Sequence, residues 1–156
     1  EGLVAAAVEL AGVSDVKVGI EEGLQPVHVD QQRLSRAVAN LVENAVKFRT
    51  GQEPIEIRIR SSSDREGCLE ISVHDRNEAV PEEDRERIFL PFEQGGDPLT
   101  GKPAGIGLGL YESRAVAALH GGSLEHRVRE GGGNEFRLTL PLPVNASERR
   151  SEVAGA

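Results

Sequence analysis

The 156-residue chain has no methionine or tryptophan, one tyrosine, one cysteine and four phenylalanines. The single cysteine, Cys68, excludes a disulfide within the chain; we expect it to be buried in a strand, and it agrees with a reducing, cytoplasmic compartment. No apolar run approaches the roughly 20 residues that a membrane-spanning helix needs, so we expect no membrane contact by this domain. Methionine and a signal-peptide pattern are both absent, which leads us to expect a piece of a longer protein.

The chain also lacks a basic cluster. Its net charge of −8 argues against nucleic acid as a partner, because binding to a phosphate backbone needs a stripe of Lys and Arg. His28, His74, His120 and His126 are scattered without the spacing of a zinc site. Hydrophobic residues make up 38% and charged residues 28%, values typical of a globular domain with one core.

Hydrophobic periodicity and turn residues predict alternating helices and strands. Asp30 is expected to cap a long helix that runs to about Arg49. Other helices are predicted over residues 2–11, 81–88 and 107–119, and strands over 16–20, 26–29, 54–62, 68–74, 124–128 and 135–140. Residues 90–104 show little periodicity and are predicted to form a flexible lid. We expect residues 1–144 to form one domain and residues 145–156 an unstructured tail.

The long helix carries the segment Asn40-Leu-Val-Glu-Asn-Ala-Val-Lys-Phe48. At about 100° per residue, Asn40, Asn44 and Lys47 share one stripe, while apolar residues occupy the opposite side. Carboxamide oxygens are hard ligands suited to Mg²⁺, and Lys47 would add a positive charge beside phosphates. Taken alone, such a stripe is more often a solvated helix face.

A second segment, Gly105-Ile-Gly-Leu-Gly-Leu110, precedes a predicted helix. Glycines leave backbone N–H groups accessible, and the N-terminus of a helix attracts anions. A short glycine repeat alone is usually a plain loop. The two segments together predict a nucleotide site.

In chain order, five features resemble the catalytic and ATP-binding domain of bacterial sensor histidine kinases, whose superfamily also contains gyrase and the MutL mismatch-repair ATPases. They are Asn40-Leu-Val-Glu-Asn44, Asp75 at a strand end, Ile88-Phe-Leu-Pro-Phe92, Gly105-x-Gly-x-Gly109 and His120-Gly-Gly122. The resemblance covers about residues 1–143. It implies the Bergerat fold, a two-layer α/β sandwich in which a mixed sheet lies against three helices and ATP sits under a flexible lid.

The resemblance implies a role for each matching residue. Asn44 resembles the Mg²⁺-binding asparagine, and Asp75 resembles the acceptor for the adenine amino group, which favours ATP over GTP. Phe89 and Phe92 look like the F-box residues that anchor the start of the lid. The expected catalytic residues are Asn40, Glu43 and Lys47, and the expected cofactor-binding residues are Asn44, Asp75, Asn77, Phe89, Phe92, Lys102, Gly105, Ile106, Gly107, Leu108 and Gly109, with Asn44 as the metal ligand.

Position 40 bears on the reaction. In hydrolysing members of the superfamily a glutamate four residues before the metal-binding asparagine activates water, and Asn40 cannot accept a proton. The site is therefore expected to hold ATP for transfer. Glu43 is either a polar helper in that transfer or a solvated helix residue. The resemblance places the acceptor histidine on a separate dimerisation domain of the same protein, with a response regulator downstream.

The sequence also departs from the family pattern. The family reads D-x-G-x-G-I-P, whereas this chain reads Asp75-Arg-Asn-Glu-Ala-Val-Pro81. If positions 77 and 79 keep φ > 0, Asn77 tolerates that conformation but Ala79 costs roughly 1 kcal/mol or more. The lid lacks the arginine often found after the F-box; Gln94 occupies that region, and Lys102 is the nearby cation. The alternatives to a kinase domain are a degenerate scaffold module with weak or no ATP binding, and a stand-alone anti-sigma-factor kinase that phosphorylates serine.

Overall fold

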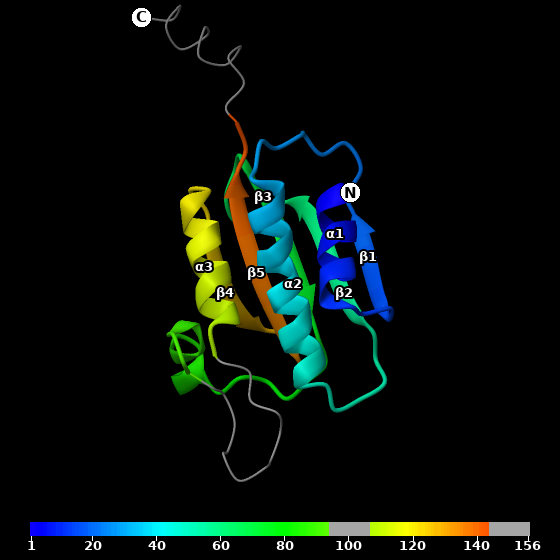
Figure 1. Cartoon of the computed structure of the whole chain (residues 1–156), viewed down its shortest axis with the longest axis vertical. Coiled ribbons are helices and arrows are strands. Elements are labelled where there is room, and N and C mark those ends of the chain that lie inside the picture. The colour runs from blue at the N-terminus through cyan, green and yellow to red at the C-terminus, as the bar shows by residue number, and fades with distance from the viewer. Residues whose placement is uncertain (94–106, 144–156) are drawn as a thin grey trace, which may run out of the picture.

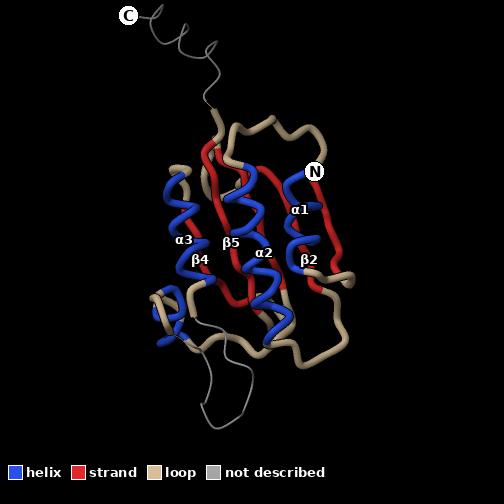
Figure 2. The backbone as a smooth tube through the Cα atoms, in the orientation of Figure 1, coloured by secondary structure: helices blue, strands red, loops and turns tan. Residues whose placement is uncertain are grey.

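The computed structural model describes residues 1–93 and 107–143, and within them the chain forms a two-layer α/β sandwich (Figures 1 and 2). Three helices lie side by side on one face of a five-stranded sheet. The helices are α1 (Gly2–Ala11), α2 (Gln31–Lys47) and α3 (Gly109–Leu119); the strands are β1 (Val16–Ile20), β2 (Ile55–Ser61), β3 (Cys68–His74), β4 (Ser123–Val128) and β5 (Asn134–Pro141). This arrangement confirms the predicted fold class.

The sheet is mixed, with the order β1-β2-β3-β5-β4. β1 and β2 pair in parallel, and every other neighbouring pair is antiparallel. Ile55, Ile57 and Ile59 of β2 are buried, whereas the residues between them are more exposed. The alternation leaves one face of the sheet for the helices and the other for charged side chains.

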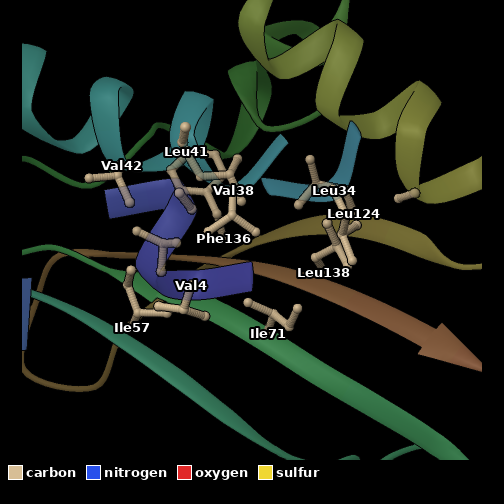
Figure 3. Packing of buried hydrophobic residues seen from close by; sticks show 14 of the residues in the cluster. Val4, Leu34, Val38, Leu41, Val42, Ile57, Ile71, Leu124, Phe136 and Leu138 are labelled. Atoms are coloured by element: carbon tan, nitrogen blue, oxygen red, sulfur yellow. The ribbon is translucent and has the colours of Figure 1, made fainter. Parts of the chain in front are cut away.

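The core lies between the sheet and the helices. In Figure 3, apolar side chains of α1 and α2, among them Val4 and Val38, gather over Ile57, Ile71 and Leu138 of the sheet. α2 is the central helix and packs against both α1 and α3. None of the described helices has both the length and the apolar composition that crossing a bilayer requires.

Hydrogen bonds fix the start of α2. Asp30 caps the helix as predicted, because its Oδ1 accepts from the backbone N of Arg33 at 3.0 Å. The backbone N of Asp30 donates to Nε2 of His120 (3.1 Å), while Nδ1 of His120 lies 2.8 Å from the carbonyl oxygen of Val116. The beginning of α2 is thereby tied to the end of α3.

Two predicted elements are wrong. Residues 26–29 form no strand; they belong to the connection that passes from β1 to α2 beyond the end of the sheet, where Pro26 offers no N–H and no strand is adjacent (Figure 1). The predicted helix over residues 81–88 is instead two 3₁₀ turns, η1 (Glu82–Asp84) and η2 (Arg87–Phe89). The second turn brings Phe89 into the core.

Smaller differences concern helix ends and the cysteine. α2 ends at Lys47, two residues before the predicted end. α3 starts at Gly109, since Gly107 has φ +75° and cannot continue a right-handed helix. Cys68 is only half-buried because it alternates with the core residues Leu69, Ile71 and Val73 and so lies on the face of the sheet that the helices do not cover.

Candidate functional site

Asp75 follows β3 directly and is only 4% exposed. Its Oδ1 accepts three hydrogen bonds, from the backbone N of Asn77 (2.9 Å), from Nδ2 of Asn134 (3.0 Å) and from the backbone N of Asn134 (3.3 Å). Within residues 1–93 and 107–143, no group hydrogen-bonds Oδ2. One carboxylate oxygen is thus fixed by the protein, and the second is left as an acceptor.

Asn134, the first residue of β5, hydrogen-bonds both Asp75 and the segment that follows it. The sequence analysis did not predict this role. Nδ2 of Asn134 also donates to the carbonyl of Glu78, and its Oδ1 accepts from the backbone N of Val80, each at 3.0 Å. The preceding Gly133 has φ +98°, and a Cβ there would collide with the carbonyl oxygen of Asp75. The run of three glycines at 131–133 was the available signal, since it marks a close backbone approach.

Asp75 lines a cavity of about 110 Å³. The cavity is lined by Ala45 and Arg49 at the end of α2, by Thr50, Gly51 and Glu53, by Ile55, and by Asp75, Arg76 and Asn77. Ligand pockets are typically about 300 Å³ or larger, so this cavity has the size of one end of a site. A larger groove of about 580 Å³ lies between α1 and α2, but Glu9 is the single charged residue that lines it, and it offers nothing to hold phosphates.

Asn77 and Ala79 do not have the positive φ on which the expected strain depended. Phe92 is the only non-glycine residue with positive φ in the described part of the chain, so the condition for strain at Ala79 is not met. Asn77 is buried, and its Nδ2 donates to the carbonyl of Ala45 at 2.8 Å. This bond turns the Asn77 side chain toward α2 and ties the segment after β3 to that helix.

Asn40 is buried between helices, not on an open face as the stripe suggested. It is 7% exposed, and its Nδ2 lies 3.3 Å from the carbonyl oxygen of Gly109 and 3.5 Å from Oγ of Ser113. The carbonyl of Gly109 can only accept, so the amide nitrogen must face α3. Ser113 is fully buried, and its hydroxyl lies 3.0 Å from the carbonyl oxygen of Ala37. Asn40, on α2, therefore ties this helix to Gly109 at the start of α3.

Asn44 lies one turn after Asn40, about 6 Å farther along the helix axis. It is half-buried, and its side chain hydrogen-bonds no described residue. Nζ of Lys47 lies 5.2 Å from the centroid of the Phe48 ring and forms no ion pair within the described ranges. Glu43 pairs with Arg36 at 3.3 Å on the exposed side of α2, a contact that leaves both of its predicted roles open.

The two predicted F-box residues differ in placement. Phe89 is 3% exposed, packs edge-on against Phe136 and lies under the guanidinium of Arg114. Phe92 is 71% exposed, so in this structure its side chain is not packed in the core as that of Phe89 is. The backbone N of Phe92 instead donates to the carbonyl of Gly107 at 2.9 Å.

Some of the predicted glycines lie within the described residues and others lie outside them. A Cβ on Gly107 would lie 2.8 Å from the carbonyl oxygen of Glu93, so glycine is required where the chain passes close to residues 92 and 93. Gly109 opens α3, with Leu108 as its N-cap. The predicted site residues Lys102, Gly105 and Ile106, together with Gln94, lie outside the described residues.

The histidines next to Asp75 are neutral near pH 7. Burial, with a smaller contribution from the nearby Arg58 and Arg129, lowers the pKa of His74 to about 4 against the opposing effect of Glu135. Burial also lowers the pKa of His126, whose Nε2 lies 2.9 Å from Oδ1 of Asn134. Neither imidazole therefore places a positive charge beside the Asp75 carboxylate.

A protein family described as histidine kinase-, DNA gyrase B- and HSP90-like ATPases matches residues 29–144. The chain belongs to this family. The match spans α2, the segment after β3 and the glycine sequence before α3, which carry the predicted site residues. The resemblance stated from the sequence is thereby confirmed.

Members of this family with similar sequences are sensor kinases. The adaptive-response sensory kinase SasA of Prochlorococcus marinus is 32% identical over 81% of this chain and 32% of its own length. The histidine protein kinase DivJ of Caulobacter vibrioides is 36% identical over 89% of this chain and 24% of its own length. The chain thus spans a third or less of these relatives.

A solved structure shows the same fold. Full-length ShkA in complex with AMPPNP has a TM-score of 0.72 and 26% identity, covering 93% of this chain and 30% of ShkA. The fold shared with ShkA therefore extends over nearly the whole chain, whereas the family match begins at residue 29.

Proposed function

We propose that this domain binds Mg-ATP and supplies the γ-phosphoryl group to a histidine on a separate dimerisation domain of the same protein, from which a response regulator receives it. The observation that carries the proposal is the asymmetry of Asp75, whose Oδ1 accepts three N–H donors while Oδ2 accepts none from the described residues. A fixed acceptor of this kind suits the amino group of adenine and repels the carbonyl of guanine. ShkA, solved with AMPPNP, supports an adenine nucleotide as the ligand.

The side chains of Asn44 and Lys47 on α2 suit a nucleotide that carries Mg²⁺. The Asn44 side chain is not engaged by any described residue, and a carboxamide oxygen is a hard, neutral ligand of the kind that Mg²⁺ accepts. When bound, Mg²⁺ would neutralise charge on the phosphate oxygens. Lys47, one turn after Asn44, would add a second positive charge near them.

Asn40 supports transfer over hydrolysis. Its carboxamide cannot take a proton from water, and its nitrogen is already committed to the carbonyl of Gly109. The contact fixes Asn40 against the start of α3. In our proposal, the described residues bind and orient the nucleotide, and the acceptor imidazole comes from the other domain.

The two alternatives receive less support. The scaffold hypothesis drew on strain at Ala79, which the backbone does not have; the missing glycines at positions 77 and 79 remain its basis. The serine-kinase hypothesis is disfavoured by the likeness to DivJ, a histidine protein kinase.

Calorimetric titration tests the binding half of the proposal. We expect AMPPNP to bind one site with a dissociation constant on the order of micromolar in the presence of Mg²⁺, more weakly after chelation, and GMPPNP to bind at least about tenfold more weakly than AMPPNP. Absence of binding, or equal affinity for the two nucleotides, would overturn it.

Phosphotransfer is tested separately, in the full protein that contains this domain. Incubation with labelled ATP should give a label that is stable to alkali and lost in acid, as a phosphoramidate on histidine requires. A label with the opposite stability would instead indicate a phosphoserine and favour the serine-kinase hypothesis.

A further inference from the structure

Residues 50–53, a loop that is part of the connection between α2 and β2, are held mainly by one side chain. None of these four residues takes part in a backbone–backbone hydrogen bond with the described chain. Arg49 supplies the donors instead: Nε donates to the carbonyl of Gly51 (3.1 Å), and Nη2 donates to the carbonyls of Gln52 (3.0 Å) and Glu53 (2.7 Å). Three successive carbonyl groups are therefore held by a single guanidinium.

The guanidinium is also paired with a carboxylate outside the loop. The contact is made by the same Nη2, which lies 2.6 Å from Oδ2 of Asp15, the residue before β1, so its two N–H groups are shared among this carboxylate and the carbonyls of Gln52 and Glu53. The Arg49 side chain is 23% exposed. Asp15 also accepts the backbone N of Ile55 through its carbonyl at 3.4 Å. Arg49 thus fixes the loop relative to the ends of α2, β1 and β2, which belong to the rigid part of the domain.

This loop is one wall of the cavity that contains Asp75. Thr50, Gly51 and Glu53 line it together with Asp75 and Asn77. A second contact crosses from the segment after β3 to the loop, where Nε of Arg76 lies 3.5 Å from Oε2 of Glu53. Both side chains of that ion pair are exposed, so the pair contributes little to holding the loop. The position of this wall therefore depends mainly on Arg49.

We propose that Arg49 is a positioning residue for the purine: by holding residues 50–53, it sets the shape of the base end of the nucleotide site and hence the affinity for the base. The inference rests on the proposed function. Arg49 acts through the loop and not on the phosphates, which would lie toward Asn44 and Lys47. Lysine could not replace it, because the loop is held by Nε and Nη2 of a planar fork that an ammonium group does not provide.

Calorimetry with Mg-AMPPNP and Mg-ADP separates the base end from the phosphate end. For Arg49→Ala and Arg49→Lys we expect both affinities to fall about tenfold, the effect of one or two lost hydrogen bonds. The ratio of the two affinities should stay at the wild-type value, because that ratio reports only the γ-phosphate. Arg58→Ala is the matched control: Arg58 pairs with Glu56 at 2.6 Å on the charged face of the sheet and does not line the cavity.

The outcomes distinguish this inference from the function on which it rests. If the wild-type chain binds neither nucleotide, the proposed function fails. If the wild type binds and both Arg49 variants bind as tightly as the wild type, the positioning role is overturned. It is also overturned if the ratio of the AMPPNP affinity to the ADP affinity differs from the wild-type ratio. Arg49→Lys retains the charge opposite Asp15, so it remains a folded test if Arg49→Ala proves unstable.

Discussion

Nδ2 of Asn134 lies 3.0 Å from Oδ1 of Asp75, although the two residues are 59 positions apart in the chain. The register of β3 and β5 brings them together, because His74 pairs with Glu135 one step further into the sheet. The Asp75 carboxylate is therefore held by Asn134 at the start of β5 as well as by the backbone N of Asn77. Such support keeps the carboxylate in one orientation before any ligand arrives.

Asp75→Asn should separate recognition from stability. If the new Oδ1 takes the place of the old one, all three N–H donors keep their acceptor, and the free energy of unfolding should change by less than about 1 kcal/mol. At the position of Oδ2, the substitution replaces an oxygen acceptor with an amide N–H donor. This donor would face the amino group of adenine, which is also a donor. We expect AMPPNP to bind at least about tenfold more weakly and GMPPNP to gain relative to it. Urea unfolding and calorimetry measure the two effects, and unchanged selectivity would refute the assignment of Asp75.

Asn134→Ala should instead act on stability first. The residue is 3% exposed, and its loss leaves the backbone N of Val80 without an acceptor and removes a donor from Asp75. We expect the free energy of unfolding to fall by about 2–3 kcal/mol. Glu130→Ala, an exposed change in the same hairpin, is the control and should be near neutral. Equal stability of the two variants would show that Asn134 does not support this corner.

Substitutions of Asn44 and Asn40, both on α2, should also differ in their effect on stability. Asn44→Ala removes a side chain that bonds no described residue, so we expect unchanged unfolding and loss of the Mg²⁺ dependence of nucleotide binding. Asn40→Ala breaks the contact with Gly109 and should also lower the melting temperature. Titrations of each variant with and without Mg²⁺, alongside thermal unfolding, check both statements. Retained magnesium dependence in Asn44→Ala would move the metal away from this residue.

Gly107, which precedes α3, and Gly109, the first residue of α3, offer a matched pair. Gly107 has φ +75°, and a Cβ there would lie 2.8 Å from the carbonyl oxygen of Glu93, whereas a Cβ on Gly109 would meet Asn40 at an ordinary 3.6 Å. Gly107→Ala should therefore cost about 1–3 kcal/mol of stability, and Gly109→Ala should be near neutral. Thermal unfolding of both variants gives the comparison. A reversed order would mean that residues 92 and 107 do not approach as described.

The sequence predicted those features of the site that have a local signal. The 3.6-residue period placed Asn44 and Lys47 on one helix, and the end of an alternating run placed Asp75 after a strand. The period alone could not tell that α3 packs on Asn40, because a polar residue at a helix–helix contact looks like an exposed one. Asn134 was missed for a related reason, since its role depends on the pairing of β3 with β5. Residues 26–29 alternate like a strand, but a strand also needs a neighbour.

The pH dependence of folding should report His74. Burial holds the pKa of this imidazole at about 4 in the folded domain, against about 6.5 in an unfolded chain. Between these values the unfolded chain binds a proton that the folded chain does not, so the free energy of unfolding falls as pH drops from about 6.5 toward 4. The difference in pKa corresponds to a loss of up to about 3 kcal/mol, complete below pH 4.

His74→Gln isolates this contribution, since the glutamine amide can still reach Oγ of Ser72, now 2.8 Å from Nε2. We expect urea unfolding of the variant to lose less stability than the wild type between pH 6.5 and 5. His126, whose pKa is also lowered by burial, should retain its own share of the slope in both proteins. His28→Gln, at an exposed position, is the control and should follow the wild-type curve. Parallel curves for His74→Gln and the wild type would show that His74 is not kept neutral by burial, and that the charged face of the sheet near Asp75 admits a proton without cost.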